Sequence, residues 1–381
     1  NQGKKAIAAA RKAYDLNAND SEKIHLLAVS LLVGGQWQSS LAYFDTLIRA
    51  EHFSDDSIEK MLKLYDEVDA KKGYLPIFQK VDKETGKKSD GLSFQLAVLE
   101  WGKQNFKDSS QILKELTVRY PQNEKLVYLL ALTQERNDQA EEALKTYLSI
   151  DPKSELYPVT RVRAFELLKR LGRNEEALAI SKEAIDAKSD QSVMFYSMSA
   201  NLLSGSGKNE EALALVDQGL AGEPGNVELL FLKAVFYEKA QKIKESMATL
   251  RDVIKRDPKH AAALNYLGYM YAERNENLKE SESLIRRALD EKPDNGYYLD
   301  SLGWVYYQQK RYKESALTLE RALQLTNSDA TVAEHLGDAY YAGGDEGKAL
   351  IAYKIAIDTA KDPKDLERVK SKYEMAKNAQ N

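Results

Sequence analysis

LGWVYY at Leu302–Tyr307 recurs as LGDAYY at Leu336–Tyr341 and, earlier in the chain, as LGYMY at Leu267–Tyr271. In each copy a glycine follows a leucine, and a tyrosine stands three positions after the glycine. The units that contain these copies begin near Ala261, Gly296 and Ala330, a spacing of roughly 34 residues that is typical of helix-pair repeats. The period therefore predicts stacked pairs of antiparallel helices.

The same register continues upstream with weaker residues at the same positions. Further units begin near Val227, Val193, Pro158, Glu124 and Asp90. Prolines close the second helix of several units, at Pro121, Pro152, Pro224, Pro258 and Pro293. Proline at such a position ends a helix and begins the turn into the next unit. The repeat thus extends over most of the chain.

The combined pattern has a small residue at the eighth position, an aromatic at the eleventh, small residues at the twentieth and twenty-seventh, and proline at the thirty-second. It resembles the tetratricopeptide repeat (TPR). The resemblance implies an all-α solenoid of about ten stacked helix-turn-helix units, coiled as a right-handed superhelix. It divides the chain into residues 1–20, the second helix of a truncated repeat; 21–89, two divergent units; 90–361, eight units; and 362–381, a C-terminal capping helix.

Four departures from the pattern predict local differences. The unit from about Ile58, with Gly73 and Tyr74, fits worst, and the polar segment Lys80–Gly91 predicts a loop with weak packing. An extra residue at Asn275–Asn277 lengthens one turn, and the helix that ends at Ile150 is short. In the capping helix, the apolar residues expected to pack are Leu366, Val369, Tyr373 and Met375.

Composition argues against several classes of function. The 55 Lys and Arg are balanced by 59 Asp and Glu, for a formal net charge of -4, so no broad basic surface is available for nucleic acid. No run of about 18 apolar residues occurs, so we expect no transmembrane segment. Cys is absent, which removes thiolate catalysis and cysteine metal ligands but leaves the redox compartment open.

No catalytic, cofactor or metal site is expected. His25, His52, His260 and His335 stand in different units and read as surface or packing residues, because zinc needs three or four converging ligands. The string GGDEGKA at Gly343–Ala349 lacks the Ser or Thr and the preceding strand of a phosphate loop, so it predicts a helix-helix turn, as does Gly205–Gly207. We therefore expect a protein that is not an enzyme and binds no cofactor.

Candidate binding residues follow from the resemblance alone. In the family, the second, fifth, ninth and twelfth positions of each first helix line the concave groove where ligand peptides lie. In this sequence those positions supply Asn265, Tyr269, Tyr297, Asp300, Trp304, Tyr307, Glu334, Asp338 and Tyr341. Aromatic anchors beside exposed carboxylates favour a protein or peptide partner with apolar side chains and Lys or Arg. The alternative is that these aromatics only pack the repeats.

The resemblance implies a non-catalytic scaffold or adaptor that binds protein segments in its groove. The runs DSLGWVYY and EHLGDAYY are also similar to those of bacterial cell-envelope repeat proteins, often lipoproteins, including some that serve secretion or polysaccharide export. We therefore expect a periplasmic or outer-membrane-associated location, with the cytoplasm as the alternative. Two other functions stay open: a self-associating structural protein, and the repeat portion of a larger enzyme.

Overall fold

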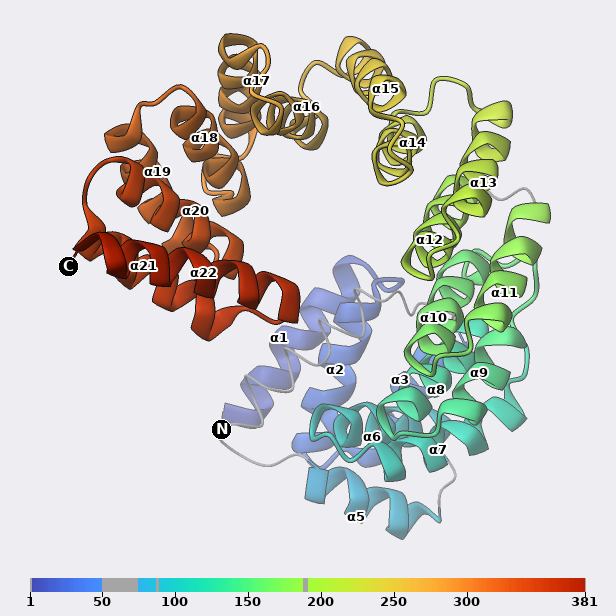
Figure 1. Cartoon of the computed structure of the whole chain (residues 1–381). Coiled ribbons are helices and arrows are strands. Elements are labelled where there is room, and N and C mark those ends of the chain that lie inside the picture. Colours follow the sequence, from blue (N-terminus) through green and yellow to red (C-terminus); the bar gives the residue numbers. More distant parts are fainter. Residues whose placement is uncertain (1, 50–74, 87–88, 188–190, 381) are drawn as a thin grey trace. The chain divides into compact units, whose positions relative to one another are not determined.

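The computed structural model describes residues 2–49, 75–86, 89–187 and 191–380, all in helices and the turns between them (Figure 1). Successive helices pack against each other as pairs, so the prediction of an all-α solenoid is confirmed. The chain divides into two compact units, residues 1–195 and 196–381. Of the unit from Ile58, residues 58–74, which include Gly73 and Tyr74, lie outside the described residues.

The first unit contains α1 to α11, with the bounds α1 Gln2–Leu16, α2 Ser21–Val33, α3 Trp37–Arg49, α5 Leu75–Thr85, α6 Asp90–Gly102, α7 Phe106–Arg119, α8 Glu124–Arg136, α9 Ala140–Leu148, α10 Tyr157–Arg170 and α11 Asn174–Asp186. The boundary between the units falls within α12, Ser192–Gly205. The second unit continues with α13 Asn209–Gly222, α14 Val227–Lys239, α15 Ile243–Arg256, α16 Ala261–Glu273, α17 Leu278–Glu291, α18 Gly296–Gln308, α19 Tyr312–Leu325, α20 Ala330–Ala342, α21 Glu346–Thr359 and α22 Pro363–Gln380.

Glycines allow the two helices of a pair to approach closely. A Cβ added at Gly303 would lie 2.5 Å from Cγ of Leu319, and one at Gly337 would lie 2.4 Å from the ring of Tyr353. Both distances are too short for carbon atoms in contact, so these positions in α18 and α20 require glycine. In α18, Tyr306 follows Gly303 by about one helical turn. Its ring fills the space beside the contact of Gly303 with Leu319 and is only 5% exposed.

Buried serines fix the same contact with a hydrogen bond. Ser315 Oγ donates to the carbonyl oxygen of Gly303 over 2.7 Å, and Ser281 Oγ donates to that of Gly268 over 2.6 Å. In the first unit, Ser109 makes the corresponding bond to Ala97 over 2.7 Å. All three serines are completely buried. The small residue at the twentieth position therefore fits its partner helix by size and also satisfies a polar group.

A recurring turn joins the two helices of each pair. In the turn between α20 and α21, the amide of Asp345 donates to the carbonyl of Tyr340, and Gly344 adopts a φ of +80°. The predicted inter-helix turns are present at Gly343–Asp345 and just after Gly205, where Gly207 also has a positive φ, of +79°. The rest of the string, Glu346–Ala349, is the first turn of α21. The extra residue near Asn275 also lengthens its turn, where Asn275 and Asn277 take φ values of 54° and 47°.

Two local predictions are wrong. The segment from Lys80 was expected to be a loop, but α5 continues to Thr85, because Phe78 and Val81 lie on one helical face and are completely buried. In the capping helix α22, Met375 is 51% exposed and Ala376 is buried in its place. The buried residues Val369 and Ala376 stand seven positions apart, which is two helical turns.

The close contact at Gly337 gives a test of this packing. Gly337→Ala should lower the free energy of unfolding by about 1–3 kcal/mol, because the buried ring of Tyr353 has no room to move. Gly205→Ala is the matched control, since its Cβ would enter open space and the change should be neutral or stabilising by up to about 1 kcal/mol. Urea unfolding with hydrogen exchange of α20 and α21 measures both. Equal effects of the two substitutions would contradict this account of the helix pair.

Candidate functional site

The candidate residues lie on three first helices of the second unit. Helix α16 packs on α18, and α18 packs on α20. Asn265 and Tyr269 belong to α16; Tyr297, Asp300, Trp304 and Tyr307 belong to α18; Glu334, Asp338 and Tyr341 belong to α20. Residues three and four positions apart share one face of a helix. Each helix therefore presents its candidate side chains as one row.

An aromatic stack forms the centre of this face. The indole of Trp304 stacks on Tyr307 with ring centroids 4.7 Å apart, and on the imidazole of His335 with centroids 4.4 Å apart. His335 comes from α20 and was not among the candidate residues, because it stands one position beyond the expected row. No signal in the single sequence distinguishes it from a packing histidine. The stack joins α18 to α20 and holds Trp304 in a fixed orientation.

The carboxylate of Asp300 contacts a ring nitrogen of His335. Nδ1 of His335 lies 2.8 Å from Oδ1 of Asp300, and both side chains are nearly buried. Burial lowers the pKa of His335, but the nearby Asp300 carboxylate outweighs this effect and the pKa is raised overall. The site therefore favours an imidazolium ion between a carboxylate and an indole face.

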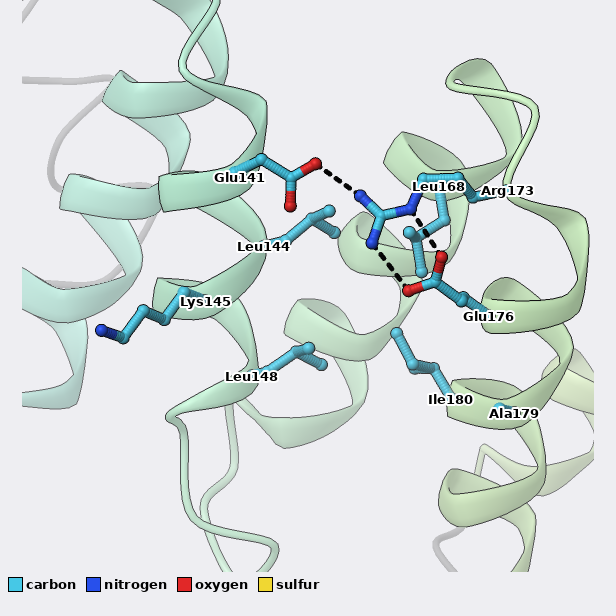
Figure 2. Close-up of a pocket in the computed structure, with 9 residues that line it drawn as sticks. All are labelled: Glu141, Leu144, Lys145, Leu148, Leu168, Arg173, Glu176, Ala179 and Ile180. Carbon is cyan, nitrogen blue, oxygen red and sulfur yellow. Dashed lines mark hydrogen bonds and ion pairs between the residues drawn. The ribbon is translucent and has the colours of Figure 1, made fainter.

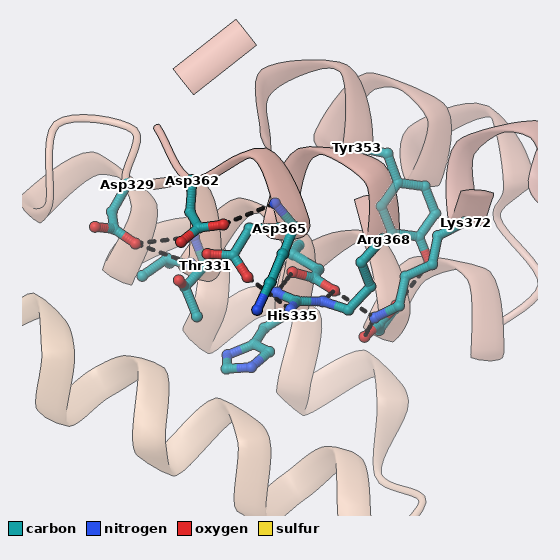
Figure 3. A network of polar contacts seen from close by, with 12 residues as sticks. Asp329, Thr331, His335, Tyr353, Asp362, Asp365, Arg368 and Lys372 are labelled. Carbon is teal, nitrogen blue, oxygen red and sulfur yellow. Dashed lines mark hydrogen bonds and ion pairs between the residues drawn. The ribbon is translucent and has the colours of Figure 1, made fainter. Parts of the chain in front are cut away.

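The three candidate carboxylates are buried, not exposed as the sequence suggested. Asp300, Glu334 and Asp338 are 7%, 4% and 9% exposed. Glu334 and Asp338 are covered by α22, whose residues Arg368 and Lys372 extend one helical turn apart over α20 (Figure 3). Asp300 on α18 is in contact with His335 instead.

Ion pairs between α20 and α22 balance this negative charge. Nε and one terminal nitrogen of Arg368 donate to the two oxygens of Glu334 over 2.8 and 2.7 Å. Lys372 Nζ lies 2.7 Å from Glu334 and 2.6 Å from Asp338, which also accepts a 2.8 Å hydrogen bond from Tyr353. Burial raises the pKa of Glu334, but the bonds to Arg368 and Lys372 lower it further than burial raises it. The Glu334 carboxylate is therefore held ionised by the chain's own cations, and Lys372 joins it to Asp338.

The open part of the face lies over α16 and the start of α18. Tyr297 is 59% exposed, and the hydroxyl of Tyr269 donates to Glu273 over 2.9 Å. Burial, Glu273 and Asp300 together raise the pKa of Tyr269, so both carboxylates lie near its hydroxyl. Oδ1 of Asn265 is buried without a hydrogen-bond partner among the described residues. Tyr341, by contrast, packs against the core that contains Tyr353 and Val369.

The remaining histidines are packing or capping residues where they are described. His25 is 2% exposed and lies against Phe44, and burial lowers its pKa to about 4. His260 caps α16, where Nδ1 accepts from the amide of Ala263 over 3.1 Å. His52 lies outside the described residues. In the part of the chain that the structure describes, no group of three His, Asp or Glu is placed to hold a metal ion.

A separate cavity opens in the first unit between α9, α10 and α11 (Figure 2). Its volume is about 330 Å³, and Leu144, Leu148, Leu168 and Ile180 form an apolar wall. The rim is an ion-pair cluster in which Arg173 contacts Glu141 over 2.6 Å and Glu176 over 2.7 Å. The short helix α9, which the sequence predicted, ends beside this opening. The lining contains no Ser, Thr, Cys or His.

Comparison with known proteins identifies the repeat. Tetratricopeptide repeat family models match residues 203–268, 274–330 and 301–365. A TPR repeat-containing protein of Pseudomonas aeruginosa is 29% identical over 134 residues, which span 35% of this chain and 22% of that protein. The matched segment is thus less than a quarter of that relative's length.

Solved structures of similar helical proteins include a TPR protein of Thermus thermophilus, 22% identical, with a TM-score of 0.40 over 46% of this chain and 94% of that one. A tetratricopeptide repeat protein of Parabacteroides merdae is 16% identical, with a TM-score of 0.41 over 75% of this chain and 98% of that one.

The chain is a helical repeat protein, as its paired helices, their close glycine contacts and the family matches show. The chain contains tetratricopeptide repeats, which the family models match over residues 203–268 and 274–365. This class serves protein-protein interaction, and protein or peptide segments are its partners. Its fold is typical of proteins without enzymatic activity. Among the described residues, no helix combines the length and apolar character needed to cross a membrane.

The contact between His335 and Asp300 predicts a pH dependence. Because the pKa of His335 is raised in the folded chain, its contribution to stability is present below the ordinary value of 6.5 and is lost as pH rises through the folded pKa. The slope is at most about 1.4 kcal/mol per pH unit. A nuclear magnetic resonance titration should show the imidazole midpoint above 6.5. Asp300→Asn should lower this midpoint, because only the Coulomb attraction of Asp338 and Glu334 then opposes the effect of burial. An unchanged midpoint would show that Asp300 does not hold the charge.

The ion pairs of α22 give a second prediction. Arg368→Ala should destabilise the docking of α22 by about 1–3 kcal/mol, because Glu334 is buried and loses two charged hydrogen bonds. Hydrogen exchange should then accelerate in α22 before the other helices of the second unit. Lys370→Ala is the control, since Lys370 is exposed on the same helix. Equal exchange in the two variants would mean that apolar packing alone holds α22.

Proposed function

We propose that this chain is a non-catalytic scaffold that binds an extended protein segment across α16 and α18 of the second unit. The observation that carries the proposal is the Trp304 stack, which holds a partly exposed indole in a fixed orientation on a first helix. A preorganised aromatic side chain loses little conformational entropy when a ligand contacts it. Tyr297 extends this surface into the solvent.

The chemistry of the partner follows from the charges that remain. Glu334 and Asp338 are neutralised by α22, so they add little attraction for a basic ligand. Glu273 is exposed beside Tyr269, and Asp300 lies within its electrostatic reach. The favoured segment therefore has an apolar side chain that contacts Trp304 and Tyr297, and one Lys or Arg that faces Glu273. The Lys or Arg of the partner therefore contacts α16, and not the carboxylates of α20, which α22 already pairs.

We also propose a bacterial cell-envelope location, in the periplasm or at the outer membrane, within an assembly for secretion or polysaccharide export. The support is the similarity of DSLGWVYY and EHLGDAYY to envelope repeat proteins. Fractionation of cells that produce the full-length gene product tests this location directly. Recovery in the cytoplasmic fraction would overturn it.

Binding is tested with a random peptide display library selected on the purified chain. For a selected peptide, Trp304→Ala should weaken binding by about 2 kcal/mol or more if the indole is a central anchor. Because Trp304 also packs against His335, Tyr297→Ser is the second variant: its side chain is 59% exposed, so binding should weaken while the unfolding curve stays the same.

Leu325→Ser is the matched control, since that side chain is also exposed but lies on a second helix. If every selected peptide binds the Trp304 and Tyr297 variants as it binds the original chain, the groove assignment is wrong. If Trp304→Ala unfolds the second unit while Tyr297→Ser binds normally, the stack serves packing alone.

A further inference from the structure

Two carboxylates of α20 interact both with the imidazole of His335 and with the cations of α22 (Figure 3). Lys372 Nζ lies 2.7 Å from Glu334 and 2.6 Å from Asp338. Arg368 also pairs with Glu334, over 2.7 Å. Both carboxylates attract the protonated form of His335 as well. A proton on His335 and the cations of α22 therefore depend on the same negative charges.

Helix α22 presents a net positive charge to this cluster. Asp365 pairs with Arg368 over 2.7 Å, which leaves two cations and one carboxylate on this part of the helix. Burial lowers the pKa of Lys372, but the two carboxylates of α20 raise it further, so Lys372 stays a cation. The guanidinium of an arginine does not lose its proton in proteins. Both cations of α22 therefore stay charged around neutral pH.

The helices on either side of α20 supply one more charge to the cluster. It is the carboxylate of Asp300 on α18, which lies 2.8 Å from the ring of His335. Burial raises the pKa of Tyr307 on α18 and of Tyr353 on α21, so both side chains stay neutral. On α19, Glu320 is bonded to a tyrosine hydroxyl instead. His335 is thus the group of this cluster whose charge changes near neutral pH.

Ion pairs are a large part of what holds α22 in place. The helix packs on α21 and is joined to α20 by the long side chains of Arg368 and Lys372. Among its described residues, only Val369 and Ala376 are buried. The apolar contact is therefore small, and the docking depends on cations that pair with buried carboxylates.

We propose that protonation of His335 weakens the docking of α22, so that this helix opens away from α20 as the pH falls. The imidazolium ion repels the cations of α22 and offsets part of the negative charge that holds them. In the open state, Glu334 and Asp338 lose their cations beside the Trp304 stack. The helix is in this sense a cap whose docking responds to pH.

The direction of the effect follows from the charge that leaves. Undocking removes net positive charge from around His335, so the pKa of His335 is higher in the undocked state than in the docked state, where it is already above 6.5. Undocking therefore takes up a proton between these two values. Docking is weakest below the docked pKa and strongest above the undocked pKa. This dependence is opposite to that of global unfolding, in which protonated His335 stabilises the fold.

The experiment measures hydrogen exchange of the full chain as protection factors, which correct for the pH dependence of the chemical exchange rate. The protection of α22 relative to α14 should fall about threefold or more from about pH 9 to about pH 6, because each unit of difference between the two pKa values contributes a factor of about ten. His335→Gln should abolish this dependence. His260→Gln is the matched control, since that histidine caps α16, and it should leave the dependence intact.

A second measurement does not require a change at His335. Coupling is reciprocal, so Lys372→Gln should raise the midpoint of the His335 titration by about 0.3 pH units or more, whether or not α22 stays docked. Lys370→Gln is the control, because Lys370 is exposed on the same helix, and it should leave the midpoint unchanged.

The proposal is wrong if the relative protection of α22 is independent of pH, or if it increases as the pH falls. It is also wrong if Lys372→Gln leaves the His335 midpoint unchanged or lowers it, since α22 and the proton would then not be coupled. No peptide enters either measurement. The outcome is therefore independent of whether the first-helix face binds a protein segment.

Discussion

The close contact between the two helices of a pair is the constraint on which the rest of the structure depends. A glycine in the first helix and a buried serine in the second meet at the same point, and the serine hydroxyl bonds to the glycine carbonyl. This contact fixes both the distance and the register of a pair. Other pairs have small residues at the same two positions, as Ala97 and Ser109 do in α6 and α7, so stacking places equivalent residues of neighbouring first helices side by side. The regular rows of side chains on α16, α18 and α20 are a consequence of this packing.

Residues that stand about one repeat apart in the sequence are in contact in the structure. Glu334 meets Arg368 and Asp338 meets Lys372, each pair 34 residues apart. Asp300 meets His335 at a separation of 35 residues, one position beyond the exact period. Such contacts cross from one repeat to the next on the first-helix face, and they involve buried or half-buried charges that are satisfied in pairs. The face is thus specified by matching neighbours, so a substitution on one helix acts through the helix beside it.

The sequence predicted what depends on one repeat and missed what depends on two. Helices, inter-helix turns at Gly207 and Gly344, and the lengthened turn at Asn275 all follow from local patterns, and the structure contains them. The burial of Glu334 does not, because it is caused by Arg368 and Lys372 on a helix that departs from the repeat. His335 was missed for a similar reason, since its partners Asp300 and Trp304 belong to the preceding repeat. The wrong prediction of a loop from Lys80 has another cause. The polar composition of the segment indicated a loop, although Phe78 and Val81 are spaced to lie on one buried helical face.

The end helix also determines the charge that the second unit presents. Helix α22 packs against α21 and is joined to α20 by the ion pairs of Arg368 and Lys372. While it is docked, Arg368 and Lys372 cancel the charges of Glu334 and Asp338. Undocking would expose two carboxylates beside the aromatic stack and make this face acidic. The stability of α22 and the ligand chemistry of the first-helix face are therefore one linked property, because the same ion pairs determine both.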